Sequence, residues 1–363
     1  MLHPLQMMAF LPLPTGAPMA PTDPSDTLAT TLQTWLEVDS TSGEEKAFLE
    51  LLEAELKEAG FSRIDRQDVA PGRYNLLART ERPARLLYST HVDTVPPFLP
   101  VRREGDRIFG RGACDTKGGL LAMLQAAKRL LAAGERDLGF LLVVGEEVDH
   151  CGAKKSVELS HLKEEGLERI ILCEPTINRV VAAQKGMLKF TLKTEGVAGH
   201  SAFVDRGTSA INKLLDVLER MRQHDWPTDT ILGPTTLNIG TIGGGVAANV
   251  FAPSAQAQVL MRAVSPIAPL LQTVEALAGE EARVEGAVYN DPVFFDPPEG
   301  YEVATVPFNT DATYVSELAP VWLVGPGDIR VAHADHEHID VSDLQAGIDL
   351  YTELGTLALR TQR

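Results

Sequence analysis

Continuous apolar runs alternate with helical periodicity in the first half of the chain. Three short runs are apolar throughout, as is typical of strands covered on both faces: Leu86–Tyr88, Gly139–Val144 and Ile170–Cys173. Gly118–Ala133 predicts a helix that is buried on most sides, and Val157–Glu165 predicts another. Strands that alternate with helices in this order predict an α/β fold with a mainly parallel sheet and helices on both faces.

Two helices are predicted ahead of the first of these strands. Residues 26–35 form the shorter one, and the longer one ends at Gly60. The longer helix carries apolar residues at helical spacing: Phe48, Leu49, Leu52 and Leu56. We interpret Ser42 and Glu45 as a capping box at its start, and a final helix begins with a similar pair, Ser342 and Gln345.

From about Gly186 the pattern changes to that of strands with one buried face and one solvent-exposed face. Apolar Leu188, Phe190 and Leu192 alternate with polar residues, and further strands are predicted at Leu237–Ile239 and, after a glycine turn, at Gln256–Ala263. The helix between them has four apolar residues on one side: Ile211, Leu214, Leu215 and Leu218. With another helix from about Pro266, this order predicts an antiparallel sheet covered by helices on one face.

The proline-rich sequence DPVFFDPPEG resembles a linker. After it the pattern of buried strands and helices returns, with a strand predicted at Val321–Val324. We therefore expect a catalytic domain formed by residues 26–184 and 291–363. A smaller α+β domain, residues 185–290, would be inserted into it. The length of 363 residues agrees with two domains.

Composition and charge argue against several partners. A net charge of -17 would repel nucleic acid and anionic membranes, and no run of about 18 apolar residues is present to span a membrane. Three cysteines without C-x-x-C spacing favour a reducing compartment, so we expect a cytoplasmic protein. Residues 1–25 lack the basic start of a signal peptide. We interpret them as a disordered extension, or as a start assigned too early, with Met19 as the alternative.

Residues that can bind metal ions follow the predicted strands. His91 and Asp93 form an H-x-D sequence after the first strand, Glu146 and Glu147 follow the second, and Glu174 follows the third. Ligands bind beyond the carboxyl ends of such strands, so we expect these side chains to meet. Imidazole suits zinc, and a carboxylate can bridge two ions. Taken alone, an H-x-D pair is more often a capped loop, and two adjacent glutamates are more often a solvated turn.

Six motifs in this order raise the specificity of the pattern. They are STHVDTVP, GRGACDTKGG, VVGEEVD, CEPT, GHSA and GPG…AHADHE. From about Asp26 onward the chain resembles a family of dinuclear zinc hydrolases. That family includes acetylornithine deacetylase, succinyl-diaminopimelate desuccinylase, aminoacylase and bacterial glutamate carboxypeptidase.

The resemblance implies two Zn²⁺ ions per chain, with Co²⁺ able to substitute. His91 and Glu174 would bind one ion, Glu147 and His333 the other, and Asp115 would bridge them. Which pair belongs to which ion is open.

The resemblance also implies roles for neighbouring residues. Glu146 would be the general base, and Asp93 would orient the imidazole of His91. A cis peptide bond is expected between Asp115 and Thr116.

Further residues are implied to contact the substrate. Lys185, Asn249 and Arg262 stand where the family places contacts with the substrate carboxylate. His200 would reach the active site of a neighbouring subunit, which implies a homodimer formed through the inserted domain. The family's usual aspartate two residues before the arginine is Leu260 here, which leaves Arg262 less firmly held.

The resemblance also implies an N-acyl amino acid as the substrate, because the family's deacylating members carry glutamate at the position of Glu174, whereas its peptidases tend to have aspartate. N-acetyl-L-ornithine, hydrolysed to L-ornithine and acetate in arginine biosynthesis, is the first choice. The alternatives are a hydrolase that frees lysine or ornithine from a carrier protein, a succinyl-diaminopimelate desuccinylase, and a dinuclear-zinc di- or carboxypeptidase. A metal-binding homologue without activity is disfavoured, because all six metal and base positions are filled.

Overall fold

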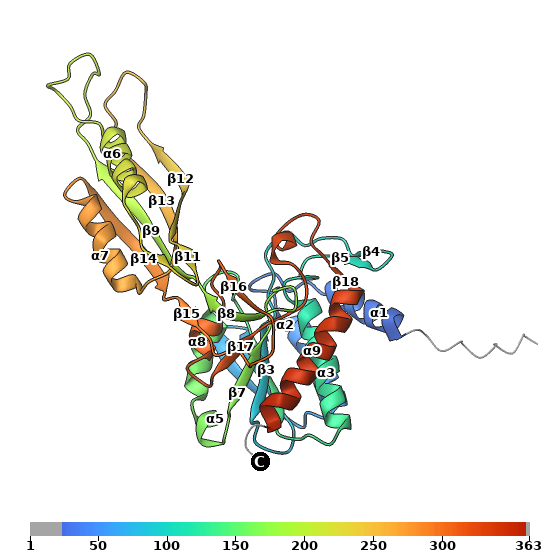
Figure 1. Ribbon diagram of the computed structural model, residues 1–363. Coiled ribbons are helices and arrows are strands. Elements are labelled where there is room, and N and C mark those ends of the chain that lie inside the picture. The colour runs from blue at the N-terminus through green and yellow to red at the C-terminus, as the bar shows by residue number, and fades with distance from the viewer. Residues whose placement is uncertain (1–23, 361–363) are drawn as a thin grey trace, which may run out of the picture.

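The structure, a computed structural model, describes residues 24–360 and contains a broad α/β domain from which a narrow α+β domain projects (Figure 1). This architecture confirms the predicted fold class. Almost all of the expected N-terminal extension lies outside the described residues. Between residues 24 and 360, no helix is both long enough and apolar enough to cross a membrane.

A six-stranded sheet forms the centre of the broad domain, in the order β1-β2-β6-β3-β7-β17. β6, β3, β7 and β17 are parallel, whereas β1 and β2 add an antiparallel edge that the sequence did not reveal, because β1 is largely polar. The strands are β1 (Arg63–Ala70), β2 (Arg73–Arg79), β3 (Leu86–His91), β6 (Leu138–Val143), β7 (Arg169–Leu172) and β17 (Val321–Leu323).

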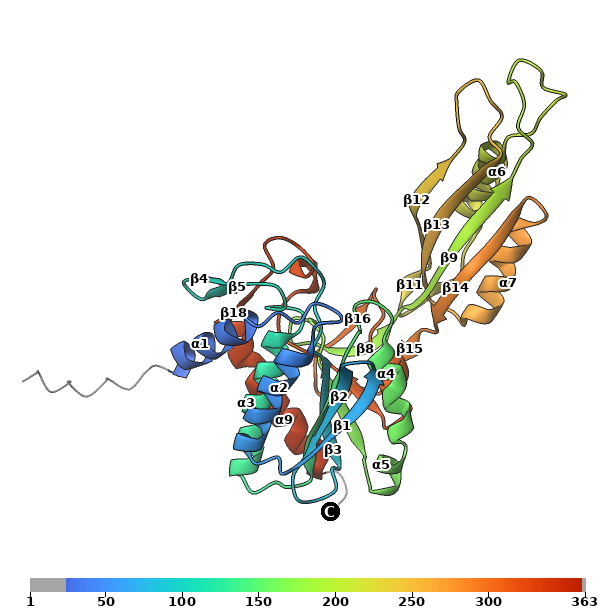
Figure 2. The ribbon, with the colours of Figure 1, turned by 180° about the vertical axis from the view of Figure 1, so that it is seen from behind.

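Alternate residues of the central strands enter two separate cores. Leu86 and Tyr88 pack in the larger core, and Leu87 packs in the core on the opposite face. Both faces are therefore covered (Figure 2). The larger core is closed by α1 (Pro24–Leu36), α2 (Lys46–Ala59), α3 (Lys117–Ala132) and α9 (Val341–Arg360). The smaller core is closed by α4 (Cys151–Ser156), α5 (His161–Glu164) and α8 (Ala312–Val315). The single helix predicted at residues 157–165 is instead a short 3₁₀ turn, Val157–Leu159, followed by α5.

The predicted capping box of α2 is wrong. The Ser42 hydroxyl donates to Asp93 Oδ2 at 2.6 Å, and the Glu45 carboxylate pairs with Arg73. Both side chains thus fix the loop before the helix and leave its first turn without a side-chain cap. The predicted end is confirmed, with Gly60 in the left-handed conformation at φ 106°.

The predicted cap of the last helix is also wrong. Ser342 lies inside the first turn of α9, and its backbone N–H and hydroxyl donate to Asp106 Oδ2 at 3.2 and 2.7 Å. The cap therefore comes from a distant loop. Tyr88 anchors the same helix to β3 by donating its hydroxyl to the Tyr351 carbonyl at 2.7 Å.

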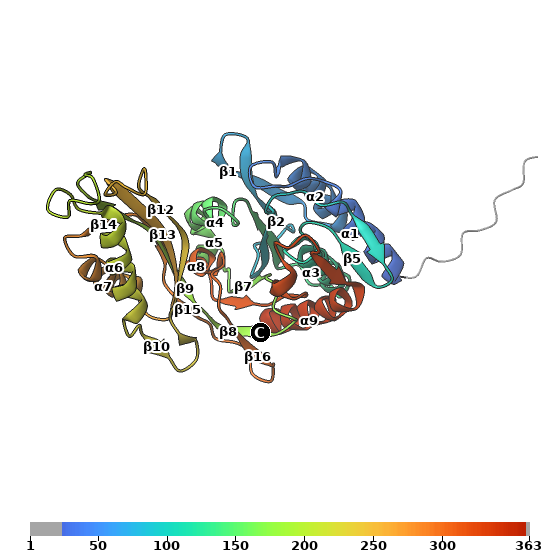
Figure 3. The same ribbon diagram turned by 90° about the horizontal axis from the view of Figure 1, so that it is seen from above.

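The narrow domain is a four-stranded antiparallel sheet in the order β12-β13-β9-β14. α6 (Ala210–Gln223) and α7 (Ile267–Ala278) cover the face turned away from the broad domain (Figure 3). Leu215 of α6 is half exposed and does not join this packed face as predicted. β14 was not predicted, because an irregularity after Glu285 interrupts its alternation. The strands are β9 (Gly186–Glu195), β12 (Thr236–Gly244), β13 (Ser254–Ala263) and β14 (Ala282–Asn290).

Two connections that lie against each other join the domains. A side chain at Gly186 would place its Cβ 2.5 Å from the Asn290 carbonyl oxygen, so only glycine allows this approach. The sequence predicted to be a linker after Asn290 instead supplies a short strand to a three-stranded sheet at the junction. Its strands are β8 (Val180–Gln184), β15 (Val293–Phe294) and β16 (Val303–Val306).

Small elements complete the fold. β18 (His338–Asp340) pairs with β5 (Arg107–Phe109), which pairs with β4 (Arg102–Glu104). This sheet holds the chain after His333 against the loop before Asp115. β10 (Thr228–Asp229) and β11 (Gly233–Pro234) form a hairpin in the inserted segment, and a 3₁₀ turn, Ile329–Val331, precedes His333.

Candidate metal centre and active site

A cavity of about 660 Å³ lies between the two domains. Its lining includes five of the predicted metal and base residues: Asp115, Glu146, Glu147, Glu174 and His333. They come from the loops that follow β6 and β7, the loop before α3 and the turn after Ile329–Val331. Segments far apart in the sequence therefore meet at the carboxyl edge of the sheet.

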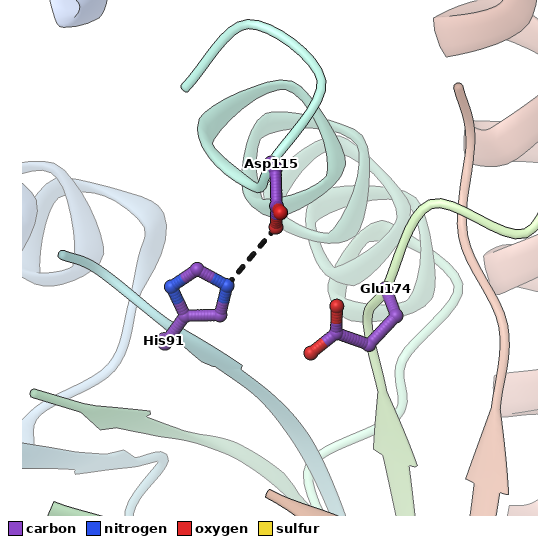
Figure 4. Close-up of side chains that lie close together, drawn as sticks. All are labelled: His91, Asp115 and Glu174. Atoms are coloured by element: carbon purple, nitrogen blue, oxygen red, sulfur yellow. Dashed lines mark hydrogen bonds and ion pairs between the residues drawn. The ribbon is translucent and has the colours of Figure 1, made fainter. Parts of the chain in front are cut away.

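The first ligand group is His91, Asp115 and Glu174, whose ligand atoms lie within 4.8 Å of one another (Figure 4). His91 Nε2 lies 3.1 Å from Asp115 Oδ1. All three residues are buried, because β3 and β7 end side by side in the middle of the sheet. We call this set the inner group.

The second ligand group is Asp115, Glu147 and His333, again within 4.8 Å. His333 Nε2 lies 3.0 Å from Glu147 Oε2 and 3.5 Å from Asp115 Oδ2. The His333 side chain is 51% exposed and has a left-handed backbone with φ 63°. We call this set the outer group. Asp115 thus turns one oxygen to each histidine, which is the arrangement a bridging carboxylate requires.

The two groups fit metal ions in donor type and spacing. Each combines one imidazole with two carboxylates, a set that zinc accepts. Two ligand atoms on one tetrahedral zinc lie roughly 3.3 Å apart, given bonds of about 2.0–2.1 Å. The separations of 3.0–3.5 Å between the imidazole and carboxylate atoms are close to that value.

The electrostatics of the site favour cations. Burial raises the pKa of Glu174 and of Glu147, and the negative charge of Asp115 adds to both effects. Bonds to Asp115 and Glu147 raise the pKa of His333 to about 10. Burial alone would lower the pKa of His91, but its bonds to Asp115 and Asp93 outweigh burial and raise it. The carboxylates around both histidines therefore favour the positively charged form of each imidazole.

Asp93 holds the site in a way that differs from the expected one. The carbonyl oxygen of Asp93, at 2.9 Å, is nearer to His91 Nδ1 than its carboxylate, at 3.6 Å. The carboxylate instead accepts the backbone N–H groups of Glu146 and Glu147, at 3.0 and 3.3 Å. Asp93 therefore fixes both the imidazole and the turn that carries the two glutamates.

Glu146 belongs to neither ligand group. Its carboxylate lies beside His150 and Asp311, and His150 Nδ1 is 3.5 Å from Glu146 Oε1 and 2.9 Å from Asp311 Oδ1. Burial raises the pKa of Glu146, and the charges of Asp311, Glu174 and Glu147 act in the same direction. A carboxyl group with a raised pKa beside a metal site has the properties of a general base. His150 and Asp311 were missed, because no local pattern distinguishes either from a surface residue.

Glu337 is a third residue whose role the sequence did not reveal. Its Oε1 accepts the backbone N–H groups of Gly112, Cys114 and Asp115 at 2.9–3.2 Å, and its Oε2 accepts from Arg111 at 2.7 Å. The only available signal was an acidic residue shortly after His333. Glu337 thus shapes the loop that presents Asp115, and this loop contains the cis peptide bond between Asp115 and Thr116 that the resemblance implied.

The structure brings only one of the four expected substrate contacts into the cavity of its own chain. Arg262, on β13, lines the cavity, and burial lowers its pKa while the charge of Glu146 opposes that shift. Lys185 donates to the Pro234 carbonyl and is not among the lining residues.

The other two expected contacts, His200 and Asn249, belong to the loop between β9 and α6 and to the loop between β12 and β13. Figure 1 shows both loops at the end of the inserted domain that lies far from the broad domain. There His200 pairs with Val250, and the carbonyl of Asn249 accepts the N–H of Ser201 at 3.0 Å. Their position matters to the site only if a second chain is present.

Comparisons with known proteins show which family the chain is similar to. A family model described as peptidase family M20/M25/M40 matches residues 87–356. A peptidase M20 domain-containing protein of Schizosaccharomyces pombe is 34% identical over 346 residues, which cover 92% of this chain and 86% of the relative. A probable carboxypeptidase of Aspergillus terreus is 36% identical over 305 residues, which cover 74% and 70%.

Two solved structures share the fold. A tripeptidase of Staphylococcus aureus superposes with a TM-score of 0.77 at 20% identity, over 93% of this chain and 99% of that one. An M20 family metallo-carboxypeptidase of Sulfolobus solfataricus superposes with a TM-score of 0.72 at 18% identity, over the same shares.

Proposed function

The chain belongs to the peptidase family M20/M25/M40 and is a metal-dependent hydrolase, and on this premise we propose that it cleaves the amide bond of an N-acyl amino acid. The observation that carries the proposal is that Arg262 lines the same cavity as the two ligand groups and Glu146. A cation opposite the reaction centre suits the free carboxylate of an amino acid.

Two ions would be held by the inner and outer groups. When bound, such a pair activates the attacking water and polarises the substrate carbonyl. We assign His91 and Glu174 to one ion, Glu147 and His333 to the other, and Asp115 to both. Zinc is supported by the mixture of imidazole and carboxylate ligands, and Co²⁺ is expected to substitute.

Glu146 would move the proton. Its carboxylate takes a proton from the attacking water and passes it to the nitrogen of the leaving amino acid. The raised pKa of Glu146 suits both steps, because the group must first accept and then release the proton near neutral pH. Its backbone is held by Asp93, which keeps this carboxylate beside the ligand groups.

Arg262 would set the direction in which the substrate binds. Leu260, two residues earlier on the same strand, lines the cavity and offers the guanidinium no charge. The guanidinium is therefore available to a substrate carboxylate, which would point the scissile amide at Glu146. Replacing Arg262 by Lys should raise KM more than it lowers kcat, because a bidentate contact becomes a single one.

N-acetyl-L-ornithine, whose hydrolysis is a step of arginine biosynthesis, is the first substrate to test. A second candidate substrate is a short peptide from which the C-terminal residue is released. The Aspergillus relative, a probable carboxypeptidase, favours this candidate. Both present the same amide and carboxylate and differ only in the acyl group. The decisive assay compares N-acetyl-L-ornithine, other N-acetyl amino acids, N-succinyl-diaminopimelate and dipeptides with the zinc-loaded enzyme. If the zinc-loaded enzyme hydrolyses none of these compounds, the proposal is contradicted.

We also propose a homodimer formed through the inserted domain. β12 is the outer strand of its sheet, and large apolar side chains are exposed on it and nearby: Ile242, Leu215, Val246, Phe203 and Val204. Pairing of two such edges would cover these residues and bring His200 and Asn249 to the partner's cavity. Analytical ultracentrifugation should give twice the chain mass, and Ile242→Asp should give monomers. A fully active monomer would contradict this interface.

The cysteines support the proposed cytoplasmic location. Cys114, Cys151 and Cys173 are all free thiols, and Cys114 and Cys173 are buried. Burial raises the pKa of Cys173 to about 12, so this thiol stays protonated and unreactive.

A further inference from the structure

The segment Asn309–Tyr314 touches both the proposed base and the junction between the domains. It includes the start of α8, which lies directly beside β15 and β8 in Figure 1. Asp311 at its centre is only 1% exposed, and Thr310 is fully buried. Buried polar groups in so short a segment depend on specific partners, although Asp311 Oδ2 has no hydrogen-bond partner among residues 24–360.

On one side, the segment holds the side chain beside Glu146. Asp311 Oδ1 lies 2.9 Å from His150 Nδ1, and the Tyr314 ring packs on the imidazole with the centroids 5.7 Å apart. The backbone of His150 is left-handed at φ 57°, a conformation that is uncommon outside glycine. The imidazole is thereby fixed with Nδ1 at 3.5 Å from Glu146 Oε1.

On the other side, the segment holds both connections to the inserted domain. The Tyr314 hydroxyl donates to Asn290 Oδ1 at 2.6 Å, and the Asn290 amide donates to Asn309 Oδ1 at 2.7 Å. At the first connection, the Thr310 hydroxyl donates to Gln184 Oε1 at 2.6 Å. Gln184 and Asn290 are the last residues of β8 and β14, the two strands at the crossing points.

We propose that Asn309–Tyr314 couples the placement of the inserted domain to the placement of Glu146. Asp311 and Tyr314 are positioning residues, and His150 is the contact through which they act. The cavity lies between the domains and includes Asn290, Tyr314, His150 and Glu146 in its lining. A rotation at the junction must carry or break the bond between Tyr314 and Asn290, and either change shifts the imidazole beside the base. This inference rests on the proposed role of Glu146.

A double-mutant cycle tests the coupling. Tyr314→Phe removes one hydroxyl and keeps the ring on His150, and Asn290→Ala removes the acceptor. We expect Tyr314→Phe to lower kcat about three- to tenfold, the effect of losing one hydrogen bond. Asn290→Ala also loses the bond to Asn309 Oδ1 and should lower kcat at least as much. Both variants should show little change in KM and unchanged metal content. The double variant should lose no more than the larger single loss. Turnover is measured on whichever substrate of the panel reacts fastest.

Two comparisons make the result decisive. Tyr301→Phe is the matched control, because its hydroxyl lies beside Glu353 on α9, away from the cavity. It should keep wild-type turnover. Wild-type kcat in Tyr314→Phe, or losses that multiply in the double variant, would overturn the coupling while an inactive Glu146→Gln still supported the proposed function. Full turnover in Glu146→Gln would overturn both.

Discussion

The inner and outer ligand groups share Asp115 but are built in different ways. The inner group takes His91 and Glu174 from the ends of two central strands, and both residues are buried. The outer group relies on His333, which stands on a left-handed turn and is half exposed. Rigid strand ends hold ligands more firmly than a turn at the surface does. For the two ions proposed above, the difference predicts that one binds tightly and the other exchanges more readily.

The largest expected effect separates chemistry from metal binding at two adjacent residues. Glu146→Gln keeps the size of the side chain but removes the proton acceptor, so kcat should fall by roughly 10²–10⁴ with both ions retained. Glu147→Gln should instead deplete the outer ion and recover in part when zinc is added. Kinetics with metal analysis distinguish the two, and the opposite pattern would mean that the roles are reversed.

Replacing each histidine should separate the two groups. His91→Ala should lower the affinity for the ion of the inner group more than the roughly 10–100-fold that is typical when a residue supporting a ligand is replaced. Added zinc should not restore activity. His333→Ala should lose the exchangeable ion and regain activity in excess zinc. The test is titration with a chelator of known affinity. Equal losses of metal affinity in the two variants would contradict the difference between the inner and outer groups.

Replacing Glu337 should affect both groups alike. Glu337→Gln keeps an acceptor for the three N–H groups but places an amide against Arg111, which loosens the loop that carries Asp115. Because Asp115 is shared, we expect both ions to bind about 10–100-fold more weakly. Glu302→Gln, an exposed residue paired with Arg179, is the control. Loss of one ion alone would contradict the bridging role of Asp115.

The smallest expected effect is a pH dependence of the metal-free protein. The pKa of His333 rises from an ordinary 6.5 to about 10 in the fold. A group whose pKa is higher in the folded state stabilises that state fully below 6.5, and this contribution is lost as the pH rises through 10. The melting temperature of the metal-free protein should therefore fall between pH 6.5 and 10. Calorimetry should show a smaller fall in metal-free His333→Ala and in the zinc-loaded enzyme.

Ligands that follow apolar strands could be predicted from the sequence. His91, Glu147 and Glu174 each stand just beyond such a run, and the parallel sheet brings those ends together. The role of Glu337 could not be predicted, because its partner Asp115 is 222 residues away in the sequence. The direction of the Lys185 side chain was equally hidden, since it depends on the local path of the chain at the crossing between domains.

Within the two larger sheets, strands with a continuous apolar run or a regular alternation were predicted, and strands with neither were not. β3, β6 and β7 are almost entirely buried, and each contains a continuous apolar run that the sequence shows directly. β1 carries mostly polar residues, and the irregularity in β14 shifts its alternation, so neither shows a clear period of two. The hydrophobic pattern therefore locates the core of the sheets better than their edges.

The crossing at Gly186 and Asn290 also bears on the order in which the chain folds. Contacts in the broad domain span most of the sequence, and the bond between Tyr88 and the Tyr351 carbonyl joins residues 263 positions apart. Closing so long a loop is slow and entropically costly. The inserted segment has its own hydrophobic core, and its two ends lie against each other. If it folds first, the part of that loop between Gly186 and Asn290 is already closed on itself, and a shorter stretch of chain remains to be closed when the last helix packs on the first strands.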